Sequence, residues 1–115
     1  MMEAKPKFIC GVFPFEGAGL GAPKPLGSLS YKVPADKRSQ FIYFRGGNSS
    51  AELVCVSVTC DGKPFRLFPI GAKAAVHVPL AVVEDLNPDT VVEVLIAAPV
   101  AVAGNVVIDI GLVEI

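Results

Sequence analysis

The densest group of polar side chains follows a short apolar run in the middle of the chain. Arg45 is followed by two glycines, and Asn48, Ser49 and Ser50 complete the segment. A cation beside small hydrogen-bonding side chains could hold an anion or a sugar hydroxyl, with Arg66 as a second cation from a neighbouring hairpin. The competing interpretation, which we favour, is a turn whose Asn and Ser side chains bond their own backbone. If a ligand binds here, its predicted residues are Arg45, Asn48, Ser49 and Arg66.

The one histidine and the three cysteines are the other residues whose types could do chemistry. His77 lies among apolar residues, and a cysteine near it in space would form a nucleophilic pair or a metal site. Neither possibility has a motif spacing behind it, so a hydrogen-bonded structural histidine and buried free thiols are favoured. Cys55 and Cys60 lie in one predicted strand, ~16 Å apart at ~3.3 Å per residue, which is too far for a disulfide bond. The third cysteine is Cys10.

Two further segments resemble ligand sites only in part. Residues 17–21 are rich in glycine, as in phosphate-binding loops, but two prolines follow and no amphipathic helix begins there. A flexible or interface-ordered loop is the favoured interpretation. Three carboxylates could bind calcium, but the regular ligand series of a calcium loop is absent, and a solvated acidic turn is favoured. These carboxylates are Glu84, Asp85 and Asp89. No catalytic residue, metal site or cofactor is predicted.

The composition argues against several classes of partner. Hydrophobic residues make up 52% of the 115 residues, charged residues make up 18%, and the net charge is -1. Such a chain has no basic stripe for nucleic acid. The longest uncharged stretch, Val94 to Ile108, is shorter than the ~20 residues of a membrane-spanning helix. An odd number of cysteines fits a reducing compartment, so we expect a cytoplasmic protein with no nucleic-acid or membrane partner.

Short strands are the elements that would position these residues. Asp61-Gly62 predicts a two-residue type I′ turn between two of them, and Pro14 is expected to end the first. The apolar run 41–44 indicates a central strand covered on both faces, and residues 79–85 fit either a strand or one helical turn. The predicted strands are Phe8–Phe13, Ser28–Val33, Phe41–Phe44, Ala51–Cys60, Lys63–Phe68, Ala74–Val78, Thr90–Ala97 and Val106–Ile115.

Short strands at this spacing, with no convincing helix, are typical of a β-sandwich or a barrel, and we favour the sandwich. We therefore predict an all-β fold: a single-domain antiparallel β-sandwich of about seven to eight short strands that spans residues 1–115. A Gly/Pro-rich loop is expected at about 14–27.

The last predicted strand carries the main functional expectation. Ile108, Ile110 and Leu112 share one face and suit a core, whereas the opposite face is too apolar to be left in water. No charged tail follows the strand, so its edge is expected to be open to strand pairing or its face to packing. The predicted interface residues are Val107, Asp109, Val113 and Ile115.

These observations predict a non-enzymatic, self-associating β-sandwich that acts as a binding or assembly module. We expect a homo-oligomer, and a protein partner or small ligand remains open. One alternative is a sandwich that binds a carbohydrate or an anion through the Arg45–Ser50 segment. A second alternative is a metal or redox site built from the cysteines and His77.

Overall fold

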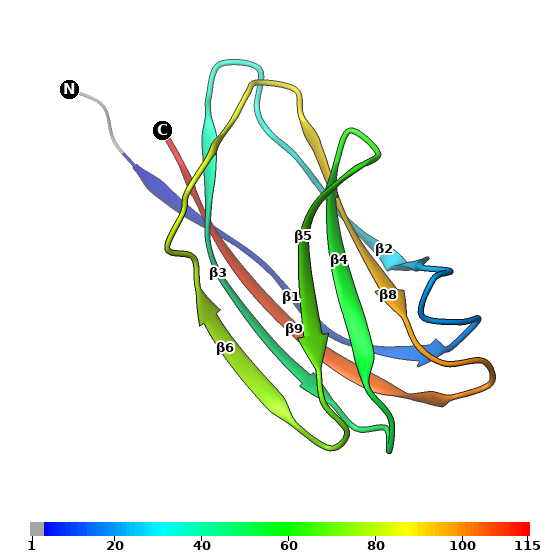
Figure 1. The fold of residues 1–115 in the computed structure, drawn as a ribbon. Helices are drawn as coiled ribbons and strands as arrows, with labels where there is room; N and C mark the ends of the chain where they lie inside the picture. Colours follow the sequence, from blue (N-terminus) through cyan, green and yellow to red (C-terminus); the bar gives the residue numbers. More distant parts are fainter. Residues whose placement is uncertain (1–3) are drawn as a thin grey trace.

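The computed structural model describes residues 4–115, which form two antiparallel sheets packed face to face (Figure 1). Among these residues, no helix has the length and apolar character required to cross a membrane. The predicted all-β sandwich is confirmed. Sheet A has the strand order β1 (Lys5–Glu16), β9 (Ala103–Glu114), β3 (Ser39–Asn48) and β6 (Ala75–Pro79), and β7 (Asp85–Leu86) also pairs with β3. Sheet B has the order β2 (Lys24–Lys32), β8 (Val91–Ala97), β4 (Val54–Cys60) and β5 (Lys63–Ile70).

Alternating apolar side chains of both sheets fill the space between them. Phe44 of sheet A stacks on Phe68 of sheet B with ring centroids 4.1 Å apart and planes at 6°. The predicted inward face of the last strand is confirmed, because its three apolar residues are almost fully buried. Those residues are Ile108, Ile110 and Leu112.

The apolar run in β3 is explained by a bulge. The pairing of β3 with β9 shifts register between Phe41 and Tyr43, so Phe41 and Phe44 both reach the core although they are three residues apart. Ile42 and Tyr43 are only half-buried. The prediction that this strand is covered on both faces is therefore wrong, since its second face is open.

The predicted hairpin is confirmed. β4 and β5 are joined by Asp61 and Gly62, with Cys60 paired to Lys63 across the turn. Both turn residues have positive φ, 52° at Asp61 and 79° at Gly62, as a type I′ turn requires. The Asp61 carboxylate also accepts a hydrogen bond from the backbone N–H of Val91, 2.9 Å away.

The first strand is longer than predicted. β1 continues through Pro14 to Glu16, and β2 begins at Lys24, so the Gly/Pro-rich loop covers residues 17–23 rather than about 14–27. Pro14 is tolerated because β1 is an edge strand that pairs with β9 alone, so a residue without an N–H can face the open side. The loop itself is bonded to the β8–β9 connection, for example from Gly17 N to Val102 O at 2.7 Å.

The segment predicted as a polar turn is also mostly strand. β3 extends to Asn48, and its residues 45–48 pair with β9 on one side, while residues 45–47 pair with β6 on the other. Because β3 pairs with a strand on each side, the backbone N–H and C=O groups of residues 45–47 have partners in the sheet and need no turn to satisfy them. The ambiguous segment 79–85 is largely irregular, since β6 ends at Pro79 and the two-residue β7 begins at Asp85.

Candidate functional site

Three polar side chains from neighbouring strands form a row across the outer face of sheet A. Arg45 in β3 is paired in register with Asp109 of β9 and with His77 of β6. Residues in register on adjacent antiparallel strands point to the same face, so the row follows from the pairing. Arg45 and His77 are exposed, and Asp109 is half-buried.

Tyr43 holds this row in place. Its hydroxyl donates a hydrogen bond to Asp109 Oδ1 at 3.1 Å, and its ring contacts the His77 ring edge-on with centroids 6.0 Å apart. The Arg45 guanidinium lies 6.0 Å from the same ring centroid. Burial and the hydrogen bond to Asp109 raise the pKa of the Tyr43 hydroxyl, so the folded protein favours the protonated form that donates this bond. The ring occupies the space left by the missing side chain of Gly111.

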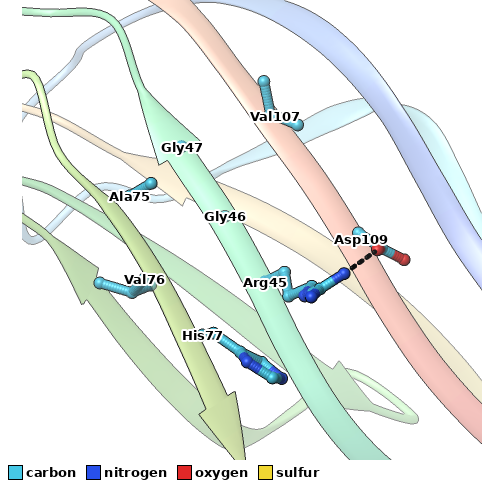
Figure 2. A pocket seen from close by; sticks show the side chains of 8 residues that line it. All are labelled: Arg45, Gly46, Gly47, Ala75, Val76, His77, Val107 and Asp109. Carbon is cyan, nitrogen blue, oxygen red and sulfur yellow. Dashed lines mark ion pairs between the residues drawn. The ribbon is translucent and has the colours of Figure 1, made fainter.

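A shallow hollow of about 490 Å³ lies beside this row and is open to solvent. Figure 2 shows Arg45 and Asp109 pointing toward each other, with the His77 ring beside Arg45. The distance from Arg45 Nη1 to Asp109 Oδ2 is 3.8 Å, which is longer than a hydrogen bond. We call this depression the Arg45 hollow. It is lined by Arg45, Gly46, Gly47, Ala75, Val76, His77, Val107 and Asp109.

An apolar strip adjoins the Arg45 hollow on the same sheet. Phe8 and Val12 in β1 are 61% and 65% exposed, and Val107 in β9 is 48% exposed. Val12 and Val107 are paired in register, and Phe8 is paired with Gly111 four residues along β9. The strip, defined as Phe8, Val12 and Val107, therefore lies next to the polar row, and the exposed Cys10 stands between its two β1 residues.

The predicted ligand residues do not gather at one site. Asn48 is buried, and its side-chain amide donates to the backbone carbonyls of Glu52, Ile70 and Gly71. Ser49 Oγ accepts a hydrogen bond from the backbone N–H of Asn105 at 2.8 Å. Asn48 Oδ1 also accepts a hydrogen bond from the backbone N–H of Ser50 at 2.9 Å, so the expected bonding of side chains to their own backbone holds for Asn48, whereas Ser49 bonds a distant strand. Arg66 lies in sheet B, against the ring of Phe65 at 4.7 Å, so it is not a partner of Arg45.

Val107, Asp109 and Val113 lie on β9 and Ile115 directly follows it, but this strand is not at an edge. β9 is paired with β1 on one side and β3 on the other, so its backbone is closed to further strand pairing and that part of the expectation is wrong. Val107 is exposed, whereas Asp109, Val113 and Ile115 are half-buried. Ile115 exchanges two backbone hydrogen bonds with Arg38, at 2.8 and 3.0 Å.

The cysteines and the histidine lie on different strands. Cys10 and His77 occupy the two opposite edge strands of sheet A, while Cys55 and Cys60 lie in β4 of sheet B. Within residues 4–115, no three His, Cys, Asp or Glu side chains gather closely enough to hold a metal ion. His77 is exposed and its ring contacts Tyr43 edge-on, and its role as a hydrogen-bonded structural histidine stays a prediction.

The thiols are expected to differ in reactivity. Cys10 is exposed, so the expectation of buried thiols is wrong for it, whereas burial raises the pKa of the Cys55 thiol and raises that of Cys60 to about 11. Because the thiolate is the reactive form, a thiol reagent should label the exposed Cys10 quickly and Cys60 at least about tenfold more slowly. The measurement is the time course of labelling without denaturant, and Cys10→Ser should abolish the fast phase. Equal rates for all three thiols would contradict this.

A buried polar cluster that no sequence pattern indicates joins the two sheets. Tyr31 of β2 donates its hydroxyl hydrogen to Glu114 Oε2 at 2.5 Å and shares a hydrogen bond with Ser39 Oγ at 2.7 Å. Glu114 is 5% exposed. The acidic residues that were considered lie at the surface instead, where Asp85 accepts hydrogen bonds from Arg38 and Gln40 at 2.8 Å each.

Comparison with known proteins shows likeness in structure but not in sequence. No protein family model and no curated protein sequence matches the chain. The CBM36-1 domain of a multidomain xylanase from the hindgut metagenome of Trinervitermes trinervoides superposes with a TM-score of 0.60 at 10% identity, covering 95% of this chain and 96% of that domain.

Chains of infectious bursal disease virus are also similar. The Gx strain gives a TM-score of 0.55 at 11% identity over 97% of this chain, and the Gt strain gives 0.51 at 13% identity over 96%. This chain spans 32% of the length of each viral chain. At such low identity the likenesses establish the β-sandwich fold of residues 4–115.

Proposed function

We propose that this chain is a non-enzymatic β-sandwich module that self-associates through the outer face of sheet A. The observation that carries the proposal is the apolar strip, three large side chains that are about half or more exposed on one face, with Val12 beside Val107 and Phe8 four residues along β1. Burial of apolar surface stabilises an assembly by ~25 cal/mol per Å². A second apolar face on the last strand is what the sequence led us to expect, and the strip extends it onto β1.

The size of the face suits a dimer. β1 and β9 are paired over twelve positions, which corresponds to ~40 Å at ~3.3 Å per residue, and three strands at ~4.8 Å spacing give a width of ~15 Å. The resulting ~600 Å² is at the lower end of the ~600–1,000 Å² that each partner buries in a specific interface. The face alone is therefore large enough for a specific contact.

Packing of faces is favoured over pairing of edges. The open edge of sheet A on this side is β1, which carries Pro6 and Pro14. Proline has no N–H to donate to a further strand, so both residues weaken strand addition. The contact is accordingly made by side chains of the outer face and not by backbone hydrogen bonds.

The partner we infer is a second copy of this chain. Arg45 and Asp109 lie side by side next to the strip, so the face carries balanced charge. Two copies related by a two-fold axis can place each Arg45 near the partner's Asp109, which makes such a face complementary to itself. The likeness to chains of a virus, which is an assembled particle, supports a role in assembly.

The proposal of a non-enzymatic role is supported by the distribution of reactive side chains. His77 and the cysteines lie on separate strands, and Arg45, Asp109 and Tyr43 are engaged with one another on an open face. Catalytic groups usually converge in a cleft that excludes water. The outer face of sheet A therefore suits contact with another protein better than catalysis.

The Phe8→Lys/Val12→Lys double variant is expected to be a folded monomer, whereas the wild-type chain forms dimers or larger closed assemblies. Both side chains are exposed in the subunit, so the charges leave the core intact. Analytical ultracentrifugation over a range of micromolar concentrations measures the assembly, and circular dichroism checks the fold. Leu67→Lys, on sheet B at 63% exposure, is the matched control and should associate like the wild type.

A second double variant tests the residues of β9. Val107→Lys with Val113→Lys is also expected to split the assembly, although Val113 is half-buried and Val107 lines the Arg45 hollow. The β1 variant is therefore the cleaner test of association. A wild-type protein that stays monomeric at high micromolar concentration would overturn the proposal.

A second candidate function, binding of a small ligand, is favoured by the convergence of Arg45, Asp109 and His77 on one hollow. Arg45 was expected to contribute to such a site, but its neighbours come from β6 and β9 and not from residues 48–49. The likeness to the CBM36-1 domain of a xylanase supports this candidate. The hollow lies mainly over β3 and β6, but it shares Arg45, Asp109 and Val107 with the proposed contact face, so a ligand and a second copy would compete for this part of sheet A.

A further inference from the structure

We infer that the Arg45 hollow binds a neutral polyhydroxylated ring, such as one sugar unit of an oligosaccharide. The inference rests on the second candidate function, ligand binding at this hollow, and names its ligand class. It is carried by three features of the hollow: donors and acceptors side by side, balanced charge, and side walls without polar groups.

Donors and acceptors stand next to each other at the rim. The Arg45 guanidinium only donates hydrogen bonds and the Asp109 carboxylate only accepts them, while His77 can do either. The 3.8 Å between Arg45 Nη1 and Asp109 Oδ2 leaves hydrogen-bonding capacity on both groups. A hydroxyl group both donates and accepts, so a pair of adjacent hydroxyls can use both groups at once.

The charges disfavour ionic ligands. An anion drawn to Arg45 would meet the Asp109 carboxylate, and a cation drawn to Asp109 would meet the guanidinium. Tyr43 fixes Asp109 through the 3.1 Å hydrogen bond, so the carboxylate is held in place. A neutral ligand meets no such repulsion. Of the two ligand classes expected from the sequence, a carbohydrate is therefore favoured over an anion.

The remaining walls suit the C–H surface of a ring. Ala75 and Val107 provide apolar side chains, and Gly47 leaves its position in β3 without a side chain. A volume of about 490 Å³ lies within the range of small-molecule sites, ~300–1,000 Å³. The hollow is open along the sheet, so neighbouring units of a chain can extend from it.

Isothermal titration calorimetry with neutral hexasaccharides of glucose, xylose, mannose and galactose tests the inference. Oligogalacturonate and inorganic phosphate serve as charged probes. At least one neutral hexasaccharide should bind, and Arg45→Ala and Asp109→Asn should each weaken it at least about tenfold. Gly47→Leu should block binding, because a Cβ at this position meets Val107 at an ordinary 3.7 Å and the rest of the side chain can enter the hollow.

Control variants distinguish sugar binding at the Arg45 hollow from binding elsewhere and from self-association. Arg66→Ala, an arginine of sheet B, should bind like the wild type, and the monomeric Phe8→Lys/Val12→Lys variant should bind at least as tightly. If only the charged probes bind, the neutral ligand class is wrong, but ligand binding by this protein is supported. If the folded protein binds no probe, both the neutral ligand class and the second candidate function are wrong. If a neutral hexasaccharide still binds to Arg45→Ala and to Gly47→Leu, the binding site is not the Arg45 hollow.

Discussion

Gly111→Ala is expected to lower the free energy of unfolding by about 2 kcal/mol, although it adds only one methyl group. Gly111 lies in β9 in register with Tyr43, whose ring fills the space of the missing side chain. A Cβ atom at Gly111 would lie 2.5 Å from Tyr43 Cδ2 and 2.7 Å from Cζ. The ring must therefore move and give up its hydrogen bond to Asp109. Denaturant unfolding measures the loss.

Gly47→Ala is the matched control for this substitution. Gly47 lies in the neighbouring strand β3, and its Cβ would meet only Val107 at 3.7 Å, an ordinary contact. Alanine is favoured over glycine inside a strand by ~0.5–1 kcal/mol, so stability should be unchanged or higher. Adding Tyr43→Ala to Gly111→Ala removes the overlap, and the two changes should cost less together than their separate effects predict. Equal losses at both glycines would contradict the packing described for Tyr43.

Tyr31→Phe is expected to lower the free energy of unfolding by about 2 kcal/mol, the size of a hydrogen bond to a charged group. It leaves the buried Glu114 carboxylate without the hydroxyl that donates to it from the other sheet. Tyr43→Phe is the matched control, because it loses a hydrogen bond to Asp109, which is half-buried and can be rehydrated. Its effect should be under about 1 kcal/mol. Thermal unfolding of both variants distinguishes the two sites.

The same cluster makes stability depend on alkaline pH. Burial, followed by the hydrogen bond to Glu114, raises the pKa of Tyr31 from 10.0 to about 12. The folded state thus favours the protonated phenol, and this contribution to stability is complete below pH 10.0 and lost as the pH rises to about 12. Ultraviolet titration should show one tyrosine ionising near the upper value, and Tyr31→Phe should remove that step. Ionisation of both tyrosines at their ordinary pKa would contradict the burial of this cluster.

Features that depend on local chemistry could be predicted from the sequence. Asp61-Gly62 supplies positive φ wherever it occurs, so the β4–β5 hairpin followed directly. The inward face of β9 followed from the strict alternation of large apolar residues. The β-sandwich was predicted for the same reason, since every strand carries its own pattern.

Features that depend on distant partners could not be predicted. The strand character of Arg45–Asn48 comes from pairing with β6 and β9, and that pairing also brings Asp109 and His77 beside Arg45. Pro14 was expected to end β1, because nothing local shows that β1 is an edge strand. Glu114 is buried by a tyrosine 83 positions away in the chain, which the sequence does not reveal.

A concentration series of methyl nuclear magnetic resonance spectra tests the proposed self-association most directly, because it reports on individual residues of each face. The account predicts that the methyl signals of Val12 and Val107 shift or broaden as the protein concentration rises. Those of Leu67, which is as exposed but belongs to sheet B, should stay unchanged. Spectra that do not depend on concentration, or shifts at Leu67 without shifts at Val12, would contradict association through the outer face of sheet A.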